Sequence, residues 1–105
     1  MIKTNNKYIL SIGLLKKDMA TSIKEDYALN VVSKELIKNN VIGFNTNFKT
    51  IGFYKGIEEK NLIISFINTY DLKTKDVIKI VDNIKKELEQ ESILLEIEKV
   101  QYAFI

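Results

Sequence analysis

The chain has 105 residues, with 16 lysine and arginine side chains against 14 aspartate and glutamate, and no cysteine, histidine, proline or tryptophan. Arginine is absent too, so every basic side chain is a lysine. These absences exclude disulfides, zinc–thiolate sites, a catalytic histidine and bidentate arginine contacts with phosphate. A net charge of +2 is too small for nucleic-acid binding held mainly by bulk charge. The length predicts one domain, residues 1–105.

The first quarter of the chain predicts a strand followed by a helix. Residues 7–15 are apolar on both faces of an extended chain, which is typical of a central strand covered on both sides. Gly13 leaves a gap on one face, where a neighbouring group can approach closely. Ser22 and Glu25 have the spacing of a capping box, so we expect a helix over 23–38.

The middle of the chain predicts two more strands and a second helix. Residues 41–56 mix turn and strand character, and residues 57–61 are expected to connect a hairpin. Residues 62–70 form a strongly apolar strand. Thr74 is a candidate cap for a helix over 75–90, whose apolar residues repeat at spacings of four and three.

The last strand changes its phase of alternation. Its apolar residues fall on one face up to Ile97 and on the other face afterwards, as Ile93, Leu95 and Ile97, and then Val100, Tyr102 and Phe104. Such a one-residue change predicts a bulge, or the end of one strand and the start of an extension.

The order strand, helix, strand, strand, helix, strand predicts an α+β protein with a ferredoxin-like βαββαβ fold. Right-handed crossovers would place both helices on one face of a four-stranded antiparallel sheet. The other face of that sheet is then open to a partner or ligand.

Several short segments resemble small uncharacterised ferredoxin-like proteins of phages and mobile elements of Gram-positive bacteria. The segments are Ile12-Gly13-Leu14 with Lys17-Asp18, then Gly52-Phe53-Tyr54, and Leu88-Glu89-Gln90-Glu91-Ser92-Ile93. Glu89 stands where that family has an asparagine. The resemblance implies a ferredoxin-like fold and a phage or plasmid setting, and it implies no established reaction.

A polar turn is the first candidate site, and its residues come from two loops: Lys17, Asp18, Gln90, Glu91 and Ser92. These side chains can bind a ligand, or they can satisfy backbone groups at the helix ends. We favour the structural role, with Asp18 as an extra cap and with Gln90 and Ser92 on helix-end carbonyls.

Three sets of carboxylates are candidates for catalysis or for a magnesium ion: Glu35, Glu58 with Glu59, and Glu96 with Glu98. Glu35 interrupts an apolar helix stripe, Glu58 and Glu59 are expected in a turn, and the last pair shares a strand face. Solvated faces explain them at least as well. We therefore predict no catalytic residue, no metal site and no cofactor.

Aromatic side chains raise the alternative of single-stranded nucleic acid, because RNA-recognition motifs share this fold and stack bases on central-strand aromatics. Tyr8, with Phe66 or Tyr70, would supply them. The strand at 62–70 lacks the basic, glycine-rich signature of that motif, so this alternative is less favoured.

The open sheet face is expected to be mostly aliphatic and to bind protein. We assign to it Ile9, Ser11, Leu15, Ile64, Phe66, Tyr102 and Phe104. An apolar patch of that size is seldom left in water, so a homodimer is predicted, with a host protein or ribonucleoprotein as a further partner.

The resulting functional hypothesis is a cytoplasmic, non-catalytic binding protein of a phage or mobile element, such as an inhibitor of a CRISPR effector. The chain is expected not to be an enzyme and to have no membrane segment. The alternatives are a nucleic-acid-binding or structural phage protein, and a small metal-independent nucleotide or RNA phosphodiesterase.

Overall fold

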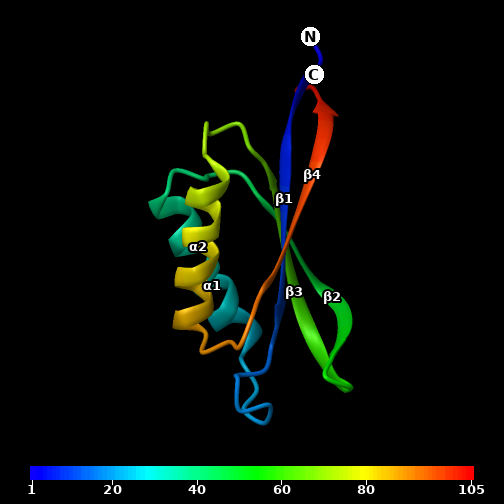
Figure 1. Ribbon diagram of the computed structural model, residues 1–105, viewed down its shortest axis with the longest axis vertical. Coiled ribbons are helices and arrows are strands. Elements are labelled where there is room, and N and C mark those ends of the chain that lie inside the picture. Colours follow the sequence, from blue (N-terminus) through cyan, green and yellow to red (C-terminus); the bar gives the residue numbers. More distant parts are fainter.

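A computed structural model describes the backbone of residues 1–105 and all side chains except that of residue 49 (Figure 1). Along the chain the elements are β1 (Lys3–Gly13), α1 (Glu25–Lys38), β2 (Asn45–Tyr54), β3 (Ile57–Ile67), α2 (Thr74–Glu87) and β4 (Leu94–Tyr102). The strands form an antiparallel sheet in the order β2-β3-β1-β4, and both helices cover one face of it. The α+β class, with two helices on an antiparallel sheet, is therefore confirmed.

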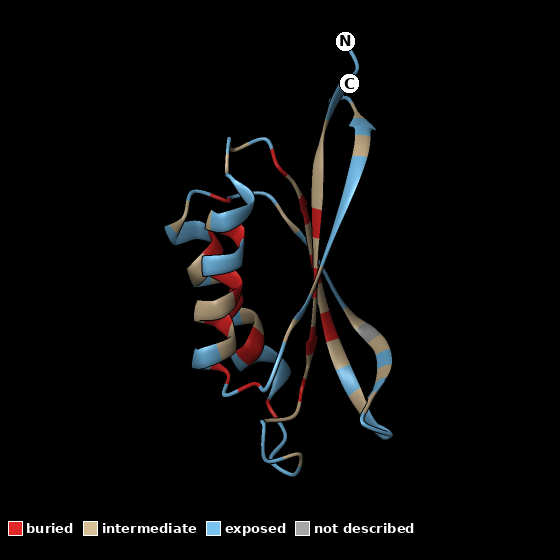
Figure 2. Ribbon diagram, viewed as in Figure 1, coloured by how far each residue is buried: buried red, intermediate tan, exposed pale blue. Residues whose placement is uncertain are grey.

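The core lies between the two helices and the sheet, where Figure 2 shows the buried residues facing one another. It is built almost entirely of aliphatic side chains, because alternate residues of β1 and β3 and one stripe of each helix point into this layer. Its fully buried members include Leu10, Ile12, Val32, Leu36, Leu62, Ile64, Val77 and Ile84.

The structure corrects the face assigned to Ile64 and Phe66. In the β1–β3 register Leu10 pairs with Ile64 and Tyr8 with Phe66, and directly paired residues of antiparallel strands share a face. Ile64 and Phe66 are therefore buried under the helices, at 0% and 3% exposure. The open face carries the alternate residues of β3, which are Ile63, Ser65 and Ile67. Both faces of this strand are apolar, so the sequence pattern left the register undecided.

Neither alternative predicted for the last strand is observed, that is, neither a bulge nor the end of one strand and the start of an extension. Pairing between β1 and β4 runs without interruption from Lys3 and Tyr102 to Ser11 and Leu94. The change of phase has a different cause, because β1 and β4 continue past the ends of the helices as a two-stranded ribbon (Figure 1). Beyond the helix layer the helix side of the strand faces solvent, and the apolar residues move to the open face. The irregular register lies instead in β2, between Asn47 and Thr50.

Both helices begin differently from the sequence prediction. The N-cap of α1 is Lys24, which makes no side-chain cap hydrogen bond, and Ser22 forms an isolated β-bridge with Leu15 instead. The loop thus holds Ser22 two residues too early for a capping box. At the start of α2 the backbone amide of Lys73 donates to Asp76 Oδ2 at 2.9 Å.

The hairpin between β2 and β3 turns earlier than predicted. Lys55 and Gly56 occupy the turn with φ values of 51° and 76°, so β3 begins at Ile57 and residues 58–61 belong to the strand. Positive φ at both central residues defines a turn that matches the twist of the flanking strands. The glycine is the residue that such a turn favours, and the lysine is not.

The aromatic side chains proposed for base stacking are used inside the fold. Tyr8 is 1% exposed, and its hydroxyl lies 3.2 Å from Thr74 Oγ1 at the start of α2. The Tyr8 and Phe66 rings pack together at 5.5 Å between centroids. The Tyr70 hydroxyl donates to the carbonyl oxygen of Gly43 at 3.1 Å. These rings stabilise the core and the loop before β2, and they do not form a stacking platform on the open face.

Within the described chain, neither helix reaches the length and apolar content that a membrane-spanning helix requires.

Candidate functional site

Three connections meet at the end of the molecule opposite the termini (Figure 1). We call this the loop end and define it as residues 14–24, 54–60 and 88–92. Hydrogen bonds join the first and third of these segments: the Lys17 amide donates to the Glu89 carbonyl at 2.8 Å, and the buried Gln90 side chain donates to the Leu15 carbonyl. The loop end is therefore a connected unit and not three independent turns.

Two ion pairs reinforce the loop end. Lys16 Nζ lies 2.5 Å from Glu89 Oε2, and Lys55 Nζ lies 2.7 Å from Glu91 Oε1. The second pair attaches the hairpin turn to the α2–β4 connection, across 36 residues of sequence. Hydrogen bonding and charge from Glu89 raise the pKa of Lys16, and Glu91 raises the pKa of Lys55 in the same way.

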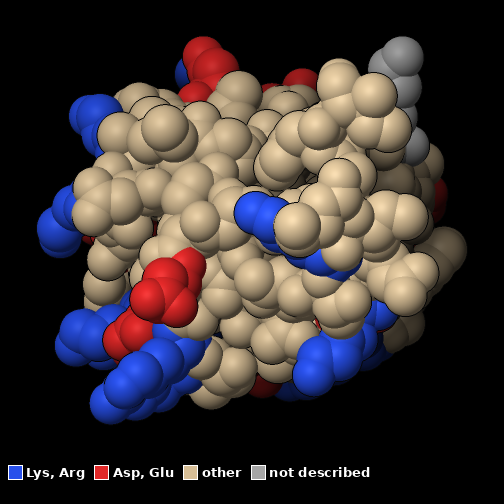
Figure 3. Space-filling model, turned by 90° about the horizontal axis from the view of Figure 1, so that it is seen from above, with Lys and Arg blue, Asp and Glu red and all other residues tan. Residues whose placement is uncertain are grey.

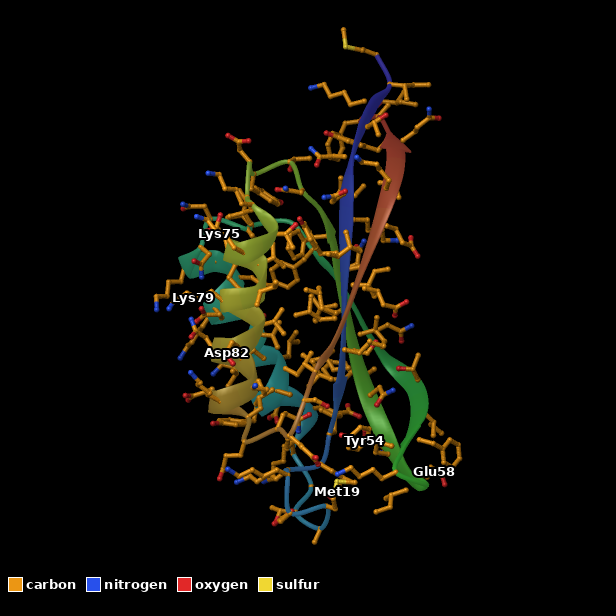
Figure 4. The ribbon with its side chains drawn as sticks, viewed as in Figure 1. Met19, Tyr54, Glu58, Lys75, Lys79 and Asp82 are labelled. Atoms are coloured by element: carbon orange, nitrogen blue, oxygen red, sulfur yellow. The ribbon has the colours of Figure 1, made fainter. Side chains whose placement is uncertain are left out.

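Three non-glycine residues of the loop end have left-handed backbone conformations. The φ values are 59° for Met19, 51° for Lys55 and 53° for Glu89. Side chains other than glycine, asparagine and aspartate rarely adopt this region, because Cβ approaches the following carbonyl oxygen. Such conformations are concentrated at binding and catalytic sites, where the surrounding structure maintains them. Figure 4 shows Met19, Tyr54 and Glu58 at this end of the molecule.

A cavity of about 750 Å³ opens between the start of α1 and the start of β3. This volume is within the range of small-molecule sites, which is roughly 300–1,000 Å³. Its apolar wall consists of Leu14, Leu15 and Ile23, and its ionisable residues are Lys24, Glu25, Asp26, Glu58, Glu59 and Lys60. Four carboxylates against two ammonium groups give the cavity an excess of negative charge, which favours a cationic ligand.

Glu59 is the most distinctive of these carboxylates. A Cβ atom on Gly13 would overlap the Glu59 carboxylate, and a Cβ atom on Gly52 would overlap the Asn61 amide. The two glycines thus let two polar side chains of β3 lie flat against neighbouring strands on the open face. Partial burial raises the pKa of Glu59 above its ordinary value. The gap predicted at Gly13 exists, and the group that approaches it is this carboxylate.

A second cavity, of about 840 Å³, lies at the opposite end beside the termini. It is lined mainly by uncharged residues of the β1–β4 ribbon and the β3–α2 loop, among them Asn5, Asn68, Thr69, Tyr102 and Phe104. Figure 3 views this end and shows mostly uncharged atoms, with lysines and acidic residues toward the edge and a lysine near the centre. Charge, strained backbone and cross-loop contacts therefore favour the loop end as the functional site.

The predicted polar turn is largely brought together by the structure, with new partners. Gln90 satisfies the carbonyl of Leu15, at the exit of β1, and not a carbonyl at the end of α2. Glu91 pairs with Lys55. Asp18 closes its own loop by accepting hydrogen bonds from the amides of Ala20 and Thr21 at 2.9 and 2.8 Å.

The other carboxylate candidates, Glu35 and the pair Glu96 and Glu98, lie away from the loop end. Glu35 Oε1 accepts from Asn83 Nδ2 at 2.9 Å and from Asn39 Nδ2 at 3.3 Å, so it joins α1 to α2. Glu96 and Glu98 lie on β4 opposite Ile9 and Lys7. Among the described residues, no group of three acidic side chains is placed to hold a metal ion.

Sequence reasoning missed Tyr54 and Lys55 and undervalued Glu59. A signal was present in the printed sequence, because Lys55-Gly56 is a two-residue turn between alternating segments, and Gly13 and Gly52 leave room on adjacent strands. Only the register places both glycines beside the polar side chains of β3.

Asp18 makes the loop end sensitive to acid. Hydrogen bonds from the hydroxyl and amide of Thr21, with a further one from the Ala20 amide, lower the pKa of Asp18 from 3.8 to about 2. A lowered pKa stabilises the folded state above pH 4, and this contribution is lost as the pH falls toward 2. We expect Asp18→Asn to flatten the decline of unfolding free energy over that interval, measured by urea titration at successive pH values. The same change at Asp71, in a loop at the other end, is the control, and equal slopes for Asp18→Asn and the parent protein would contradict the prediction.

The fold is a ferredoxin-like α+β fold, and a cavity of small-molecule size opens at its loop end. No family model and no curated protein matches the sequence. One similar solved structure is a phage SAM lyase in its apo state, with a TM-score of 0.67 and 16% identity; the match covers 94% of this chain and 87% of that one. Another is a phage SAM lyase in complex with S-methyl-5'-thioadenosine, with a TM-score of 0.64 and 18% identity; the match covers 95% of this chain and 90% of that one. CPII, a nitrogen regulatory PII-like protein from Thiomonas intermedia K12 bound to ADP, AMP and bicarbonate, matches with a TM-score of 0.60 and 11% identity over 100% and 99%. At these identities the likeness shows a shared fold.

These matches contradict two expectations from the sequence. The fold is shared with a phage lyase over nearly the whole chain, so the hypothesis of a non-catalytic inhibitor of a CRISPR effector is wrong, and so is the expectation that the chain is not an enzyme. Of the earlier hypotheses, the small metal-independent nucleotide or RNA phosphodiesterase is the nearest to these findings, because it alone is an enzyme that processes nucleotides. The error lay in treating missing histidine, cysteine and arginine as evidence against every kind of catalysis.

Proposed function

We propose that this chain is a phage enzyme that binds S-adenosylmethionine at the loop end and cleaves it to release S-methyl-5'-thioadenosine. The observation that carries the proposal is the cavity of about 750 Å³ with its excess of carboxylates, in a fold shared with a phage SAM lyase. S-adenosylmethionine carries a positively charged sulfonium, and its adenosine part is large and partly apolar. The aliphatic wall of the cavity suits the adenosine part, and its excess of carboxylates favours a substrate that carries positive charge.

The chemistry explains why so small a set of reactive side chains is sufficient. An oxygen of the substrate's own carboxylate attacks the carbon next to the sulfonium, so that a carbon–oxygen bond forms as the carbon–sulfur bond breaks. The electron pair of the broken bond moves to the sulfur, which leaves as the neutral thioether of S-methyl-5'-thioadenosine, and the amino-acid part closes to a five-membered lactone. This departure needs no proton donor, so the absence of histidine removes no group that the leaving step requires. The carboxylates that line the cavity attract the cationic substrate, and one of them, Glu59, lies against Gly13 of the neighbouring strand.

The direct test is to incubate the purified protein with S-adenosylmethionine and to measure S-methyl-5'-thioadenosine by liquid chromatography with mass spectrometry. Release that scales with protein concentration is expected, and it should persist in the presence of EDTA because the proposal uses no metal. If the product forms no faster than in protein-free buffer, the proposal is wrong.

A second copy of the chain is the partner that we propose for the open sheet face. Half-buried aliphatic residues, among them Ile9, Ile63 and Ile67, lie there beside Ser11 and Ser65. An apolar surface of this kind is covered most simply by the same surface of a second copy. We expect light scattering at micromolar concentration to give twice the chain mass of 12.2 kDa. A mass of one chain, unchanged up to 100-fold higher concentration, would contradict self-association.

A further inference from the structure

At the hairpin turn the ammonium group of Lys55 lies close to a carboxylate and to an aromatic ring. This ammonium lies 2.7 Å from Glu91 Oε1 and 5.5 Å from the centroid of the Tyr54 ring. A carboxylate combined with an aromatic face is a general means of recognising organic cations, because both attract positive charge and the ring adds dispersion contact. Tyr54 is the last residue of β2 and Glu91 lies in the α2–β4 connection, so the two groups come from different segments of the loop end.

Turn chemistry does not explain the lysine. The first position of a turn with two positive φ values favours asparagine, aspartate or glycine, and lysine is strained there. The ion pair offsets little of that strain, because its side chains are 58% and 42% exposed and exposed pairs contribute little to stability. Neither local conformation nor net stability therefore accounts for a lysine at this position.

We propose that the Tyr54 ring and the Glu91 carboxylate form the subsite for the cationic centre of the ligand, and that the Lys55 ammonium occupies it until the ligand displaces it. The inference rests on the proposed function and deepens it, because it assigns the sulfonium to a particular pair of groups at the loop end, outside the residues that line the cavity. The exposed lysine can move into solvent without disturbing the fold, and its removal from the subsite leaves the carboxylate free for the incoming cation.

Two stable ligands that differ in charge at this point provide the test. Sinefungin carries an amine in place of the sulfonium, whereas S-adenosylhomocysteine is neutral there, and neither is a sulfonium that can be cleaved. By isothermal titration calorimetry we expect the parent protein to bind sinefungin more tightly. Lys55→Met should increase the affinity for sinefungin about 2- to 5-fold, the factor that corresponds to an exposed ion pair, and leave that for S-adenosylhomocysteine within 2-fold. Glu91→Gln should lower sinefungin affinity about 5- to 10-fold with the same neutral ligand unaffected.

A matched ion pair outside the loop end supplies the controls. Lys86 Nζ lies 2.9 Å from Asp82 Oδ2 on the outer side of α2, so Lys86→Met and Asp82→Asn remove the same charges elsewhere. Both should leave the affinities unchanged, and thermal melts of all variants will show that they remain folded. If the parent protein binds both ligands and Lys55→Met changes the two affinities equally, or changes neither, the subsite is wrong and the proposed function remains intact. Binding of neither ligand by the folded parent protein would overturn both.

Discussion

Glu59→Gln is expected to lower kcat/KM for S-adenosylmethionine by about 100-fold, the scale on which single preorganised electrostatic groups act in active sites. The amide keeps the size of the side chain and its place against Gly13, and it removes one negative charge from the residues that line the cavity. The fold should be unaffected, because the carboxylate makes no core contact. The measurement is the initial rate of S-methyl-5'-thioadenosine release at substrate concentrations well below KM.

The pH profile and a control variant make this prediction specific. Because burial raises the pKa of Glu59, activity should fall with decreasing pH at a higher pH than an ordinary glutamate would give. Glu98→Gln, on β4 opposite Lys7, removes the same charge from a distant part of the sheet and should change kcat/KM less than 3-fold. If both variants retain more than half of the parent activity, Glu59 has no role in the reaction.

Ile64→Ala is expected to lower the free energy of unfolding by about 3 kcal/mol, as is typical when a fully buried isoleucine is truncated. Ile64 is 0% exposed and points from β3 into the layer between the sheet and the helices, so the shortened side chain leaves a cavity that the close-packed layer cannot refill. Urea unfolding followed by circular dichroism gives the value. Ile78→Ala, on the outer side of α2 at 54% exposure, should cost less than about 1 kcal/mol. Similar losses for the two variants would mean that the assigned faces are wrong.

The type and order of the elements could be predicted from the sequence, because helix and strand periodicities are local properties of the chain. The face of β3 could not be predicted, since Ile63 and Ile64 are equally apolar and only the pairing with β1 distinguishes them. The sequence also did not show where the helix layer ends, so the phase change at Val100 was interpreted as a bulge or as the start of an extension. The predicted cap of α1 was wrong for a related reason. Ser22 is held in a β-bridge with Leu15, a tertiary contact that the local sequence does not indicate.

The candidate site was less predictable than the fold. Gln90 and Glu91 could be singled out from a short pattern, but their partners, Leu15 and Lys55, lie 75 and 36 residues away. Such contacts follow from how connections meet at one end of the sheet, and no local pattern encodes them. The position of Glu59 depends in the same way on what the neighbouring strand lacks.

That dependence on Gly13 changes how sequence variation in this protein should be interpreted. A comparison that scores each column separately would treat Gly13 as a replaceable small residue of a strand and Glu59 as the informative position. In this sheet the two columns describe one feature, because any side chain on Gly13 takes the volume that the carboxylate now fills. Homologues that keep the glutamate but replace the glycine should therefore be grouped, for function, with those that have lost the glutamate.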